Sequence, residues 1–319
     1  MILVTGPSGF IGKHLIENLL LDHPSIYALS RKAIPEGVTV GRVKSVRGDI
    51  TEEIKLPSDV RTIYHCAGVL QQEDQMVKVN IDGTKNIAEA ALKQGCRLIH
   101  LSSAGVIGRY QSKVIDESSA CSPQNLYEKT KYEAEKVVRE FIKHGLDARI
   151  LRPTIVFGVK ESTREDGFLQ LLRSMASGTY KNIGHGNGIY NIVHVNEVVR
   201  VMRMLNDNAI GRGRFFFINT PTTFKAISEI VSEEVSPGRG KFRDIPFVPA
   251  FCAAVCFSFL SLLTGRRVAL TLPRLRVLTN RYVFSQELLE NAFHYRPLKN
   301  VEEYVREVCR AYLQRGLLN

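Results

Sequence analysis

Three residues with acid–base or hydroxyl chemistry follow one another in the middle of the chain: Ser103, Tyr127 and Lys131. Tyr127 and Lys131 are four residues apart, so they share one face of a helix. A free tyrosine has a pKa of about 10, but a neighbouring ammonium stabilises its phenolate and lowers that pKa. A hydroxyl at Ser103 can hydrogen-bond a substrate oxygen opposite the tyrosine. The set therefore predicts proton transfer to or from an alcohol or carbonyl oxygen.

A glycine-rich turn, TGPSGFIG at residues 5–12, precedes this set in the chain. Gly6 permits a tight turn, Gly9 lets the backbone approach a pyrophosphate, and Gly12 permits close packing of a helix against a strand. An apolar strand pattern comes before the turn and a helical pattern after it, so the helix N-terminus faces the anion. In this context the turn predicts a dinucleotide site.

The end of the second predicted strand indicates which dinucleotide is bound. NAD sites usually carry Asp or Glu there to hold the ribose 2′-hydroxyl. This chain has Ser30, Arg31 and Lys32 instead, with two cations and no acid. Arginine holds phosphate through paired hydrogen bonds. We therefore predict NADP in preference to NAD, the alternative being that Arg31 and Lys32 are only solvated loop charges.

The elements that must position these residues alternate along the first half of the chain. Short β-branched runs are separated by stretches of helical periodicity, which is typical of βαβ units with helices on both faces of a parallel sheet. The predicted strands are Ile2–Thr5, Ile26–Leu29, Val43–Arg47, Thr62–Cys66, Arg97–Ser102 and Ala148–Leu151. The predicted helices include Lys13–Leu21, Val79–Gln94 and Tyr127–His144.

These patterns predict an α/β fold with a Rossmann-type doubly wound parallel sheet and a smaller, mostly helical C-terminal substrate lobe. Residues 1–158 form the NAD(P)-binding domain, to which residues 190–222 return. Residues 159–319 form the substrate-binding lobe. The active site is expected at the carboxyl ends of the strands, in the cleft between the lobes.

Composition excludes several classes of protein. Hydrophobic residues make up 44% and charged residues 24% of the 319 residues, which is ordinary globular usage and argues against disorder. Six cysteines are scattered without zinc-ligand spacing, so we predict no metal site and a reducing compartment. The first residues show no secretory signal pattern, and we expect a cytoplasmic protein.

The net charge of +11 is concentrated in one basic segment, residues 239–281, which holds eight cations against one acid. The segment surrounds an uncharged apolar run over residues 250–263. We predict that this run is a buried helix of the second lobe, with an interfacial or partner-binding helix as the alternative. Its basic flanks can contact an anionic membrane surface or meet a substrate diphosphate. No nucleic-acid-binding motif accompanies the charge, so we predict no nucleic-acid partner.

Beyond these patterns, most of the chain resembles the extended short-chain dehydrogenase/reductase family, also called the NAD-dependent epimerase/dehydratase family. The motifs that carry the resemblance are TGPSGFIG (5–12), GDI (48–50), HCAG (65–68), VN (79–80), HLSSAGVIG (100–108), Tyr127 with Lys131, LRPTIVFG (151–158) and NIVHVNEV (191–198). Residues 279–297 look more like the branch that contains 3β-hydroxysteroid dehydrogenases and dihydroflavonol reductases.

This resemblance implies roles for individual residues. Ser103 orients the substrate, Tyr127 moves the hydroxyl proton, Lys131 supports Tyr127 and binds ribose, and hydride passes to or from C4 of nicotinamide. Related proteins pair through helices such as Val79–Gln94 and Tyr127–His144, so we expect a homodimer. The implied cofactor-binding residues are Gly6, Ser8, Gly9, Phe10, Ile11, Gly12, Ser30, Arg31, Lys32, Asp49, Ile50, Cys66, Ala67, Gly68, Asn80, Ser102, Tyr127, Lys131, Pro153, Thr154 and Ile155.

Departures from the family pattern narrow the predicted reaction. Family dehydratases carry an acidic pair where this chain has Ala104 and Gly105, so elimination lacks its acid and base. Many nucleotide-sugar members have Asn at the position of Ile155 and Arg at that of Tyr190. We predict an NAD(P)-dependent oxidoreductase or epimerase acting on a secondary alcohol or ketone, first of a nucleoside-diphosphate sugar. The alternatives are a hydroxysteroid-like or other hydrophobic alcohol and, in another class, a non-catalytic dinucleotide-sensing protein.

Overall fold

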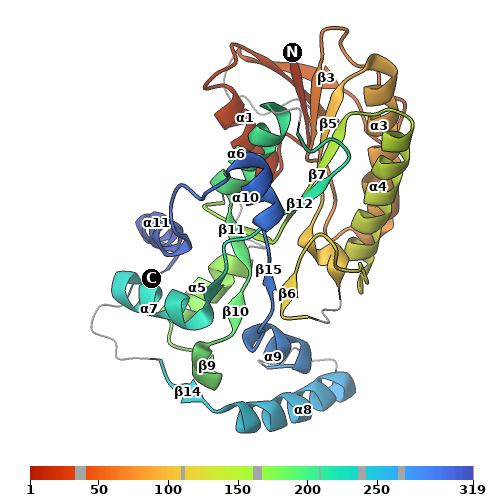
Figure 1. Cartoon of the computed structure of the whole chain (residues 1–319). Helices are drawn as coiled ribbons and strands as arrows, with labels where there is room; N and C mark the ends of the chain where they lie inside the picture. Colours follow the sequence, from red (N-terminus) through yellow and green to blue (C-terminus); the bar gives the residue numbers. More distant parts are fainter. Residues whose placement is uncertain are drawn as a thin grey trace.

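A seven-stranded parallel sheet forms the centre of the computed structural model (Figure 1). The strand order is β12-β7-β5-β4-β1-β2-β3. The first six strands of this sheet, in chain order, lie within two residues of their predicted bounds. The sheet strands are β1 (Ile2–Thr5), β2 (Ile26–Ser30), β3 (Val43–Arg47), β4 (Thr62–His65), β5 (Arg97–Leu101), β7 (Ala148–Pro153) and β12 (Phe215–Ile218). The structure describes residues 1–32, 41–108, 112–160, 167–207, 210–235, 242–264 and 270–318.

Helices cover both faces of this sheet, as predicted for the doubly wound α/β class (Figure 1). On one face lie α1 (Phe10–Leu19) and α6 (Val195–Asp207), and on the other α3 (Gly83–Gln94) and α4 (Leu126–Lys143). The strand order reverses between β1 and β4, and in such sheets the crevice outside this point binds ligands. Before α3 come α2 (Glu73–Val77) and a π-helical turn (Lys78–Asp82), so this helical stretch begins earlier than predicted.

The second lobe is built mainly from helices that pack around their own apolar core (Figure 1). Its helices are α5 (Gly167–Ala176), α7 (Phe224–Val235), α8 (Phe247–Thr264), α9 (Leu272–Leu278) and α11 (Val301–Gln314). Two-stranded ribbons connect the lobe to the sheet domain. They pair β8 (Ile155–Phe157) with β11 (Ile192–His194), β10 (Ile189–Tyr190) with β13 (Thr222–Thr223), β9 (Asn182–Ile183) with β14 (Asp244–Ile245), and β6 (Val114–Ile115) with β15 (Val283–Phe284).

One C-terminal segment lies on the sheet domain rather than in the lobe. Helix α10 (Glu287–Phe293) packs against β12, and Leu289, Phe293 and Tyr295 are buried in the core beneath α1 and α6. The predicted division returned only residues 190–222 to the sheet and did not include this segment. A periodic apolar pattern shows that a helix is buried, but it does not show which element buries it.

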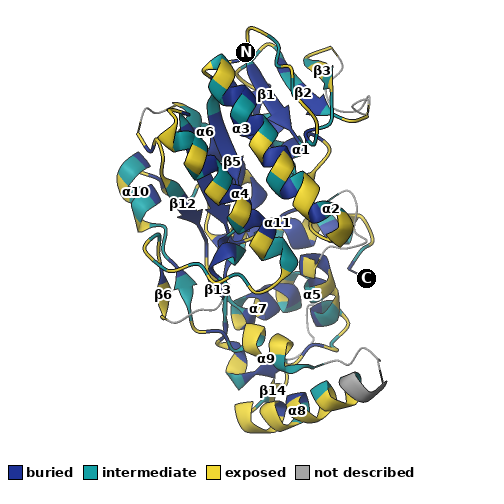
Figure 2. Cartoon of the chain, turned by 90° about the vertical axis from the view of Figure 1, so that its right-hand side faces the viewer, coloured by how far each residue is buried: buried dark blue, intermediate teal, exposed yellow. Residues whose placement is uncertain are grey.

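Helix α8 corrects the prediction of a buried helix over residues 250–263. Among residues 247–261, whose burial the structure describes, only Ala250 and Ala254 are buried, in a small cluster with Ile183 and Leu275. The large side chains of α8 face outward, and the helix is mostly exposed at the end of the lobe (Figure 2). The prediction was wrong because an apolar run is buried only where enough neighbouring structure covers it, and the short α9 does not cover α8. No helix in the described part of the chain is long and apolar enough to cross a bilayer.

Candidate active site

The glycine turn between β1 and α1 is shaped by backbone atoms that lie unusually close together. Gly6 has a positive φ of 67°, and a Cβ atom there would lie 2.8 Å from the backbone nitrogen of Ala67. A Cβ atom at Gly12 would lie 2.1 Å from the carbonyl oxygen of Gly6. Both positions therefore require glycine. The turn leaves the N-terminus of α1 facing the crevice, and this backbone cradle fits a dinucleotide pyrophosphate.

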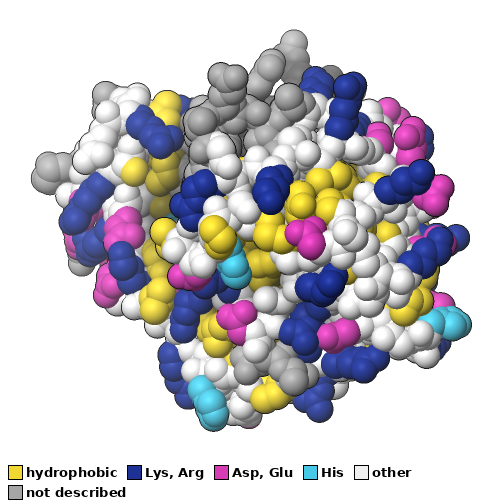
Figure 3. Space-filling view, turned by 90° about the horizontal axis from the view of Figure 1, so that it is seen from above, with side chains coloured by type: hydrophobic (Ala, Val, Ile, Leu, Met, Phe, Trp, Pro, Cys, Tyr) yellow, Lys and Arg dark blue, Asp and Glu magenta, His cyan; other side chains and the backbone are white. Residues whose placement is uncertain are grey.

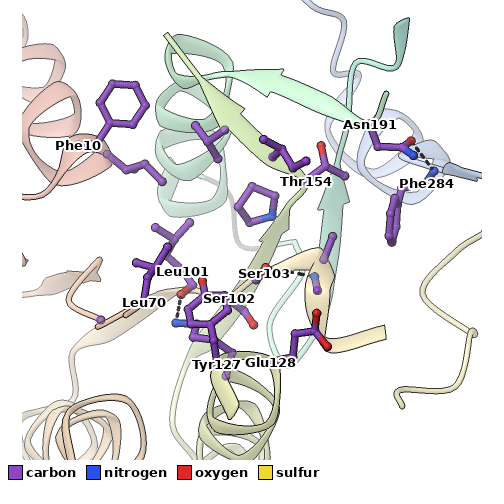
Figure 4. A pocket seen from close by; sticks show the side chains of 18 of the residues that line it. Phe10, Leu70, Leu101, Ser102, Ser103, Tyr127, Glu128, Thr154, Asn191 and Phe284 are labelled. Atoms are coloured by element: carbon purple, nitrogen blue, oxygen red, sulfur yellow. Dashed lines mark hydrogen bonds between the residues drawn. The ribbon is translucent and has the colours of Figure 1, made fainter. Parts of the chain in front are cut away.

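A cavity of about 830 Å³ extends from this turn to the second lobe. Figure 4 shows residues of the turn, strand ends and α4 around it, with Phe10 on one side and Phe284 on the other. The structure thus brings most of the predicted site together. The predicted residues that line the cavity are Gly9, Phe10, Ile11, Gly12, Cys66, Ala67, Gly68, Ser102, Ser103, Tyr127, Lys131, Pro153, Thr154 and Ile155.

The other predicted residues lie outside the cavity lining: Gly6, Ser8, Ser30, Arg31, Lys32, Asp49, Ile50 and Asn80. Arg31 and Lys32 are exposed at the end of β2. The pKa of the Asp49 carboxyl is lowered, first by the backbone N–H of Thr51 and to a smaller extent by Arg31 and Lys78. Arg31 at the end of β2 is therefore close enough to the GDI segment to influence its carboxylate.

Asn80 holds the chain around the site rather than opening onto it. Its buried side chain accepts a hydrogen bond from the Val69 backbone nitrogen at 2.8 Å. It donates to the Val69 carbonyl and to Thr130 Oγ1, each at 3.0 Å. Asn80 thus fixes the loop after β4 to α4, and its contact with the cofactor stays a prediction.

Tyr127 stands in the first turn of α4, which is fixed by a capping box. The Asn125 side chain accepts a hydrogen bond from the Glu128 backbone nitrogen at 2.9 Å, and the Glu128 carboxylate accepts one from the Asn125 nitrogen at 3.4 Å. This cap directs Tyr127 toward the end of β5, where Ser103 lies. The Ser103 hydroxyl accepts a hydrogen bond from the Gly105 nitrogen at 3.1 Å, and it lies close enough to the Tyr127 phenol to lower the pKa of that group. The structure therefore places the two predicted groups within reach of one substrate oxygen.

The pKa of Tyr127 is raised, whereas the sequence predicted that it is lowered. Burial is the main cause, because it removes water from the phenolate, and the hydrogen bond with Ser103 offsets this in part. Lys131 is held at the end of β5. Its Nζ donates to the Leu101 carbonyl at 2.6 Å, and burial lowers its pKa to about 8.

A buried ion pair beneath the site was not predicted. Arg152 Nε and Nη2 lie 2.8 and 2.5 Å from the two carboxylate oxygens of Glu135, and both side chains are fully buried. Ser102 Oγ donates to the same carboxylate at 2.5 Å. The pair joins β7, α4 and the end of β5. Glu135 follows Lys131 by one helical turn, but a glutamate in an amphipathic helix ordinarily faces solvent, so the pattern gave no reason to bury it.

The lobe side of the cavity is largely apolar and aromatic. The residues that form it are Lys160, Ile189, Tyr190, Asn191, Val277, Asn280, Tyr282 and Phe284. Lys160 is the only cation that the lobe contributes among the described lining residues. Most of these side chains could not be assigned to the site from sequence, since they come from short strands and turns without a chemical motif. Within the ranges that the structure describes, no three His, Cys, Asp or Glu side chains gather as a metal site requires.

The sequence of the sheet domain decides the family. Residues 2–218 match the model described as the NAD dependent epimerase/dehydratase family. The chain belongs to this family. As predicted, it is an NAD(P)-dependent enzyme of the extended short-chain dehydrogenase/reductases.

Similar proteins within this family carry several activities. The chain is 26% identical over 285 residues to N-acetyl-alpha-D-glucosaminyl-diphospho-ditrans,octacis-undecaprenol 4-epimerase of Escherichia coli O157:H7, covering 86% of this chain and 84% of that one. It is 25% identical to sterol-4-alpha-carboxylate 3-dehydrogenase, decarboxylating, of Saccharomyces cerevisiae, covering 99% and 98%. The fold is similar to that of UDP-glucuronic acid 4-epimerase from Bacillus cereus in complex with NAD, with a TM-score of 0.76, 18% identity and 99% of each chain covered.

Proposed function

We propose that this enzyme oxidises a secondary alcohol or reduces the corresponding ketone through Ser103, Tyr127 and Lys131. The observation that carries the proposal is that Ser103, Tyr127 and Lys131 line one cavity that begins at the glycine turn. In the oxidation direction, the Tyr127 phenolate takes the hydroxyl proton while Ser103 donates a hydrogen bond to the same oxygen. A nicotinamide dinucleotide held at the glycine turn would supply the hydride chemistry of this reaction. Epimerisation follows if the ketone is reduced from its opposite face.

Lys131 supports this proton transfer by its charge. Its ammonium is buried one helical turn from Tyr127 and is held at the end of β5 by the Leu101 carbonyl. In a buried site a positive charge stabilises a nearby phenolate more strongly than it does in water. The raised pKa of Tyr127 therefore falls when Lys131 and the cofactor ribose take up their working positions.

NADP remains our proposal for the preferred cofactor. Arg31 and Lys32 are exposed beyond the end of β2, where a 2′-phosphate is held in enzymes of this fold. The test is a pair of titrations of the whole enzyme with NADP and NAD. We expect tighter binding of NADP and a loss of that preference in Arg31→Ala, while equal preference in the wild type would contradict the proposal.

The lobe wall favours a substrate with a large apolar part. A diphosphate is usually held by several cations and hydrogen-bond donors, whereas the described lobe lining offers Lys160 together with aromatic and aliphatic side chains. Ile155 and Tyr190 line the cavity where many nucleotide-sugar enzymes carry amide and guanidinium groups. We infer that the alcohol belongs to a sugar or ring system attached to an apolar carrier. The name of one relative contains a sterol, and that of the other contains an undecaprenol joined to its sugar by a diphosphate, so both names include a large apolar group.

A nucleoside-diphosphate sugar is the second candidate, because Lys160 and the amides of Asn191 and Asn280 offer hydrogen-bond donors to it. Elimination is not proposed. The one carboxylate in the described lining, Glu128, accepts hydrogen bonds from the backbone nitrogens of Gln124 and Asn125.

The deciding experiment compares Tyr127→Phe with Tyr132→Phe, a matched change on the same helix outside the cavity lining. Turnover is measured with NADP or NAD on a polyprenyl-diphosphate-linked sugar, a sterol alcohol and a nucleotide sugar. We expect Tyr127→Phe to lower kcat by about 10² to 10⁴-fold on the preferred substrate and Tyr132→Phe to change little. Full turnover in Tyr127→Phe would refute the proposed chemistry and favour a dinucleotide-sensing role.

A further inference from the structure

Helix α8 presents the largest group of exposed hydrophobic side chains in the described structure. Its 18 residues extend over about 27 Å, and none of them is charged. Val248 is 68% exposed and Phe259 is 64% exposed. The other large apolar side chains that α8 exposes are Phe247, Phe251, Val255, Phe257 and Leu260. A continuous apolar surface of this kind marks a contact with something outside the chain.

The charges around α8 have one sign. Residues 245–286 contain five arginines and no acidic residue. Arg243, Arg274, Arg276 and Arg281 are exposed next to α8 in the chain or on α9 and the turn after it. The nearest acid, Asp244, lies 3.0 Å from His185. Four cations of the predicted basic segment, Arg239, Lys241, Arg266 and Arg267, lie outside the described residues.

The opposite end of the molecule is different. Seen from that end in Figure 3, acidic and basic side chains are interspersed over the surface. The combination of an uncharged apolar helix and mostly basic surroundings distinguishes the α8 end of the lobe from the end seen in Figure 3.

We propose that α8 lies in the plane of an anionic membrane surface, with its apolar side chains among the acyl chains and the arginines at the phosphates. Anionic lipid satisfies both features at once, because it offers hydrocarbon beside negative charge. A second copy of this chain would cover the apolar side chains, but it would bring two sets of arginines together. An acidic membrane is therefore the occupant that the charges favour.

The contacts of α8 join it to the wall of the active-site cavity. Ala254 packs with Leu275 of α9, and Ser258 Oγ accepts a hydrogen bond from the Leu272 nitrogen at 3.0 Å. Asn280, which follows α9, exchanges two hydrogen bonds with Ile189 of β10, at 2.8 and 3.1 Å. Asn280, Ile189 and the half-exposed Val277 all line the cavity.

A membrane-bound α8 would therefore hold the lobe side of the cavity near the lipid surface. If the proposed function is right, an alcohol on an apolar carrier reaches Tyr127 while its carrier stays in the bilayer. The access of such a substrate to Tyr127 rests on the proposed function, whereas the binding of α8 to the membrane does not.

The test is flotation of the full chain with vesicles, without substrate, so that its result is independent of turnover. Vesicles of phosphatidylcholine alone are compared with vesicles that also contain phosphatidylglycerol, at low and high salt. We expect the protein to float with the anionic vesicles and to be released at least severalfold by high salt. In the double variant Val248→Asp/Phe259→Asp, we expect the fraction of protein that floats with anionic vesicles to be at least fivefold smaller than in the wild type.

The matched control is Leu21→Asp/Leu298→Asp, which places the same charges at exposed leucines far from α8 in the chain. This control should float like the wild type, and all variants are first checked for wild-type thermal unfolding. A second measurement needs no α8 substitution. Cys252 and Cys256 are exposed on α8, so a polarity-sensitive fluorophore attached there should shift to the blue when anionic vesicles are added.

Three results would overturn the proposal. They are a wild type that does not float, equal loss of flotation in both double variants, and a fluorophore on α8 that does not respond to vesicles. Light scattering that shows a dimer split by Val248→Asp/Phe259→Asp, without vesicle binding by the wild type, would assign the surface to a second copy instead.

Discussion

Two regions on either side of the substrate cavity, the buried polar side chains beneath its sheet side and helix α8 beyond its lobe side, are built in opposite ways. At the sheet end, charged and polar side chains are buried and hold one another, as Glu135 does with Arg152 and Ser102. At the lobe end, α8 contains no charge, and its large side chains have little cover. A buried charge requires particular partners inside the chain, so the first region is fixed from within. An exposed apolar helix such as α8 satisfies its backbone hydrogen bonds internally. Its side chains require no particular partners within the chain.

The largest effect is expected from breaking the buried pair. Glu135→Ala leaves the Arg152 guanidinium fully buried without its carboxylate, which should lower the free energy of unfolding by about 3–5 kcal/mol. Urea unfolding followed by circular dichroism measures this loss. The control, Glu140→Ala on the same helix, removes an exposed partner of Lys143 and should change the free energy by less than about 0.5 kcal/mol. An equal decrease in the free energy of unfolding in both variants would contradict the prediction that the buried ion pair contributes more to stability than the exposed one.

The second prediction concerns the glycine turn. In Gly12→Ala the new methyl group would overlap the carbonyl oxygen of Gly6, so the turn must open. We expect NADP binding to weaken by about a hundredfold, the equivalent of about 3 kcal/mol of overpacking. Isothermal titration calorimetry measures the Kd. In the control Gly167→Ala the methyl group meets no atom within 4 Å, and the Kd should not change. Wild-type affinity in Gly12→Ala would place the dinucleotide elsewhere.

Much of the sheet end could be predicted because its chemistry depends on local spacing and on the geometry of parallel strands. The turn at residues 5–12 and the Tyr127–Lys131 pair are motifs of neighbouring residues, and the carboxyl ends of parallel strands bring them to one edge. The Glu135–Arg152 pair could not be predicted, because its residues are 17 positions apart in sequence and side chains of both types ordinarily lie on the surface. The raised pKa of Tyr127 was missed for a related reason, since burial is a property of the folded environment.

The third prediction is smaller and separates catalysis from stability. Ser103 lowers the pKa of Tyr127, so Ser103→Ala should raise it further. Oxidation needs the phenolate, whose fraction falls about tenfold for each pH unit below this pKa. The rising limb of kcat against pH should therefore move to higher pH. At neutral pH we expect a loss of about tenfold to a hundredfold, the effect of one hydrogen bond to a charged group. A lower kcat with an unmoved pH profile would mean that Ser103 acts only by holding substrate.

The lobe end was predicted less well because the burial of an apolar helix depends on its neighbours. Residues 250–263 have the composition of a core helix, and nothing in that composition distinguishes a helix covered by protein from one covered by lipid. The difference lies in the small number of contacts that reach α8, through Ala250 and Ala254.

The smallest expected effect tests this contrast directly with one substitution at two sites. Val248→Ala on α8 removes methyl groups that are already exposed, so the free energy of unfolding should change by less than about 0.5 kcal/mol. Val201→Ala on α6 removes the same atoms from a fully buried site and should cost about 2 kcal/mol. Both positions are helical, so the gain in helix propensity from alanine is shared and cancels in the comparison. A loss at Val248 as large as that at Val201, growing with protein concentration, would show that other copies of the chain cover α8 in solution. A negligible loss leaves the α8 surface open to lipid.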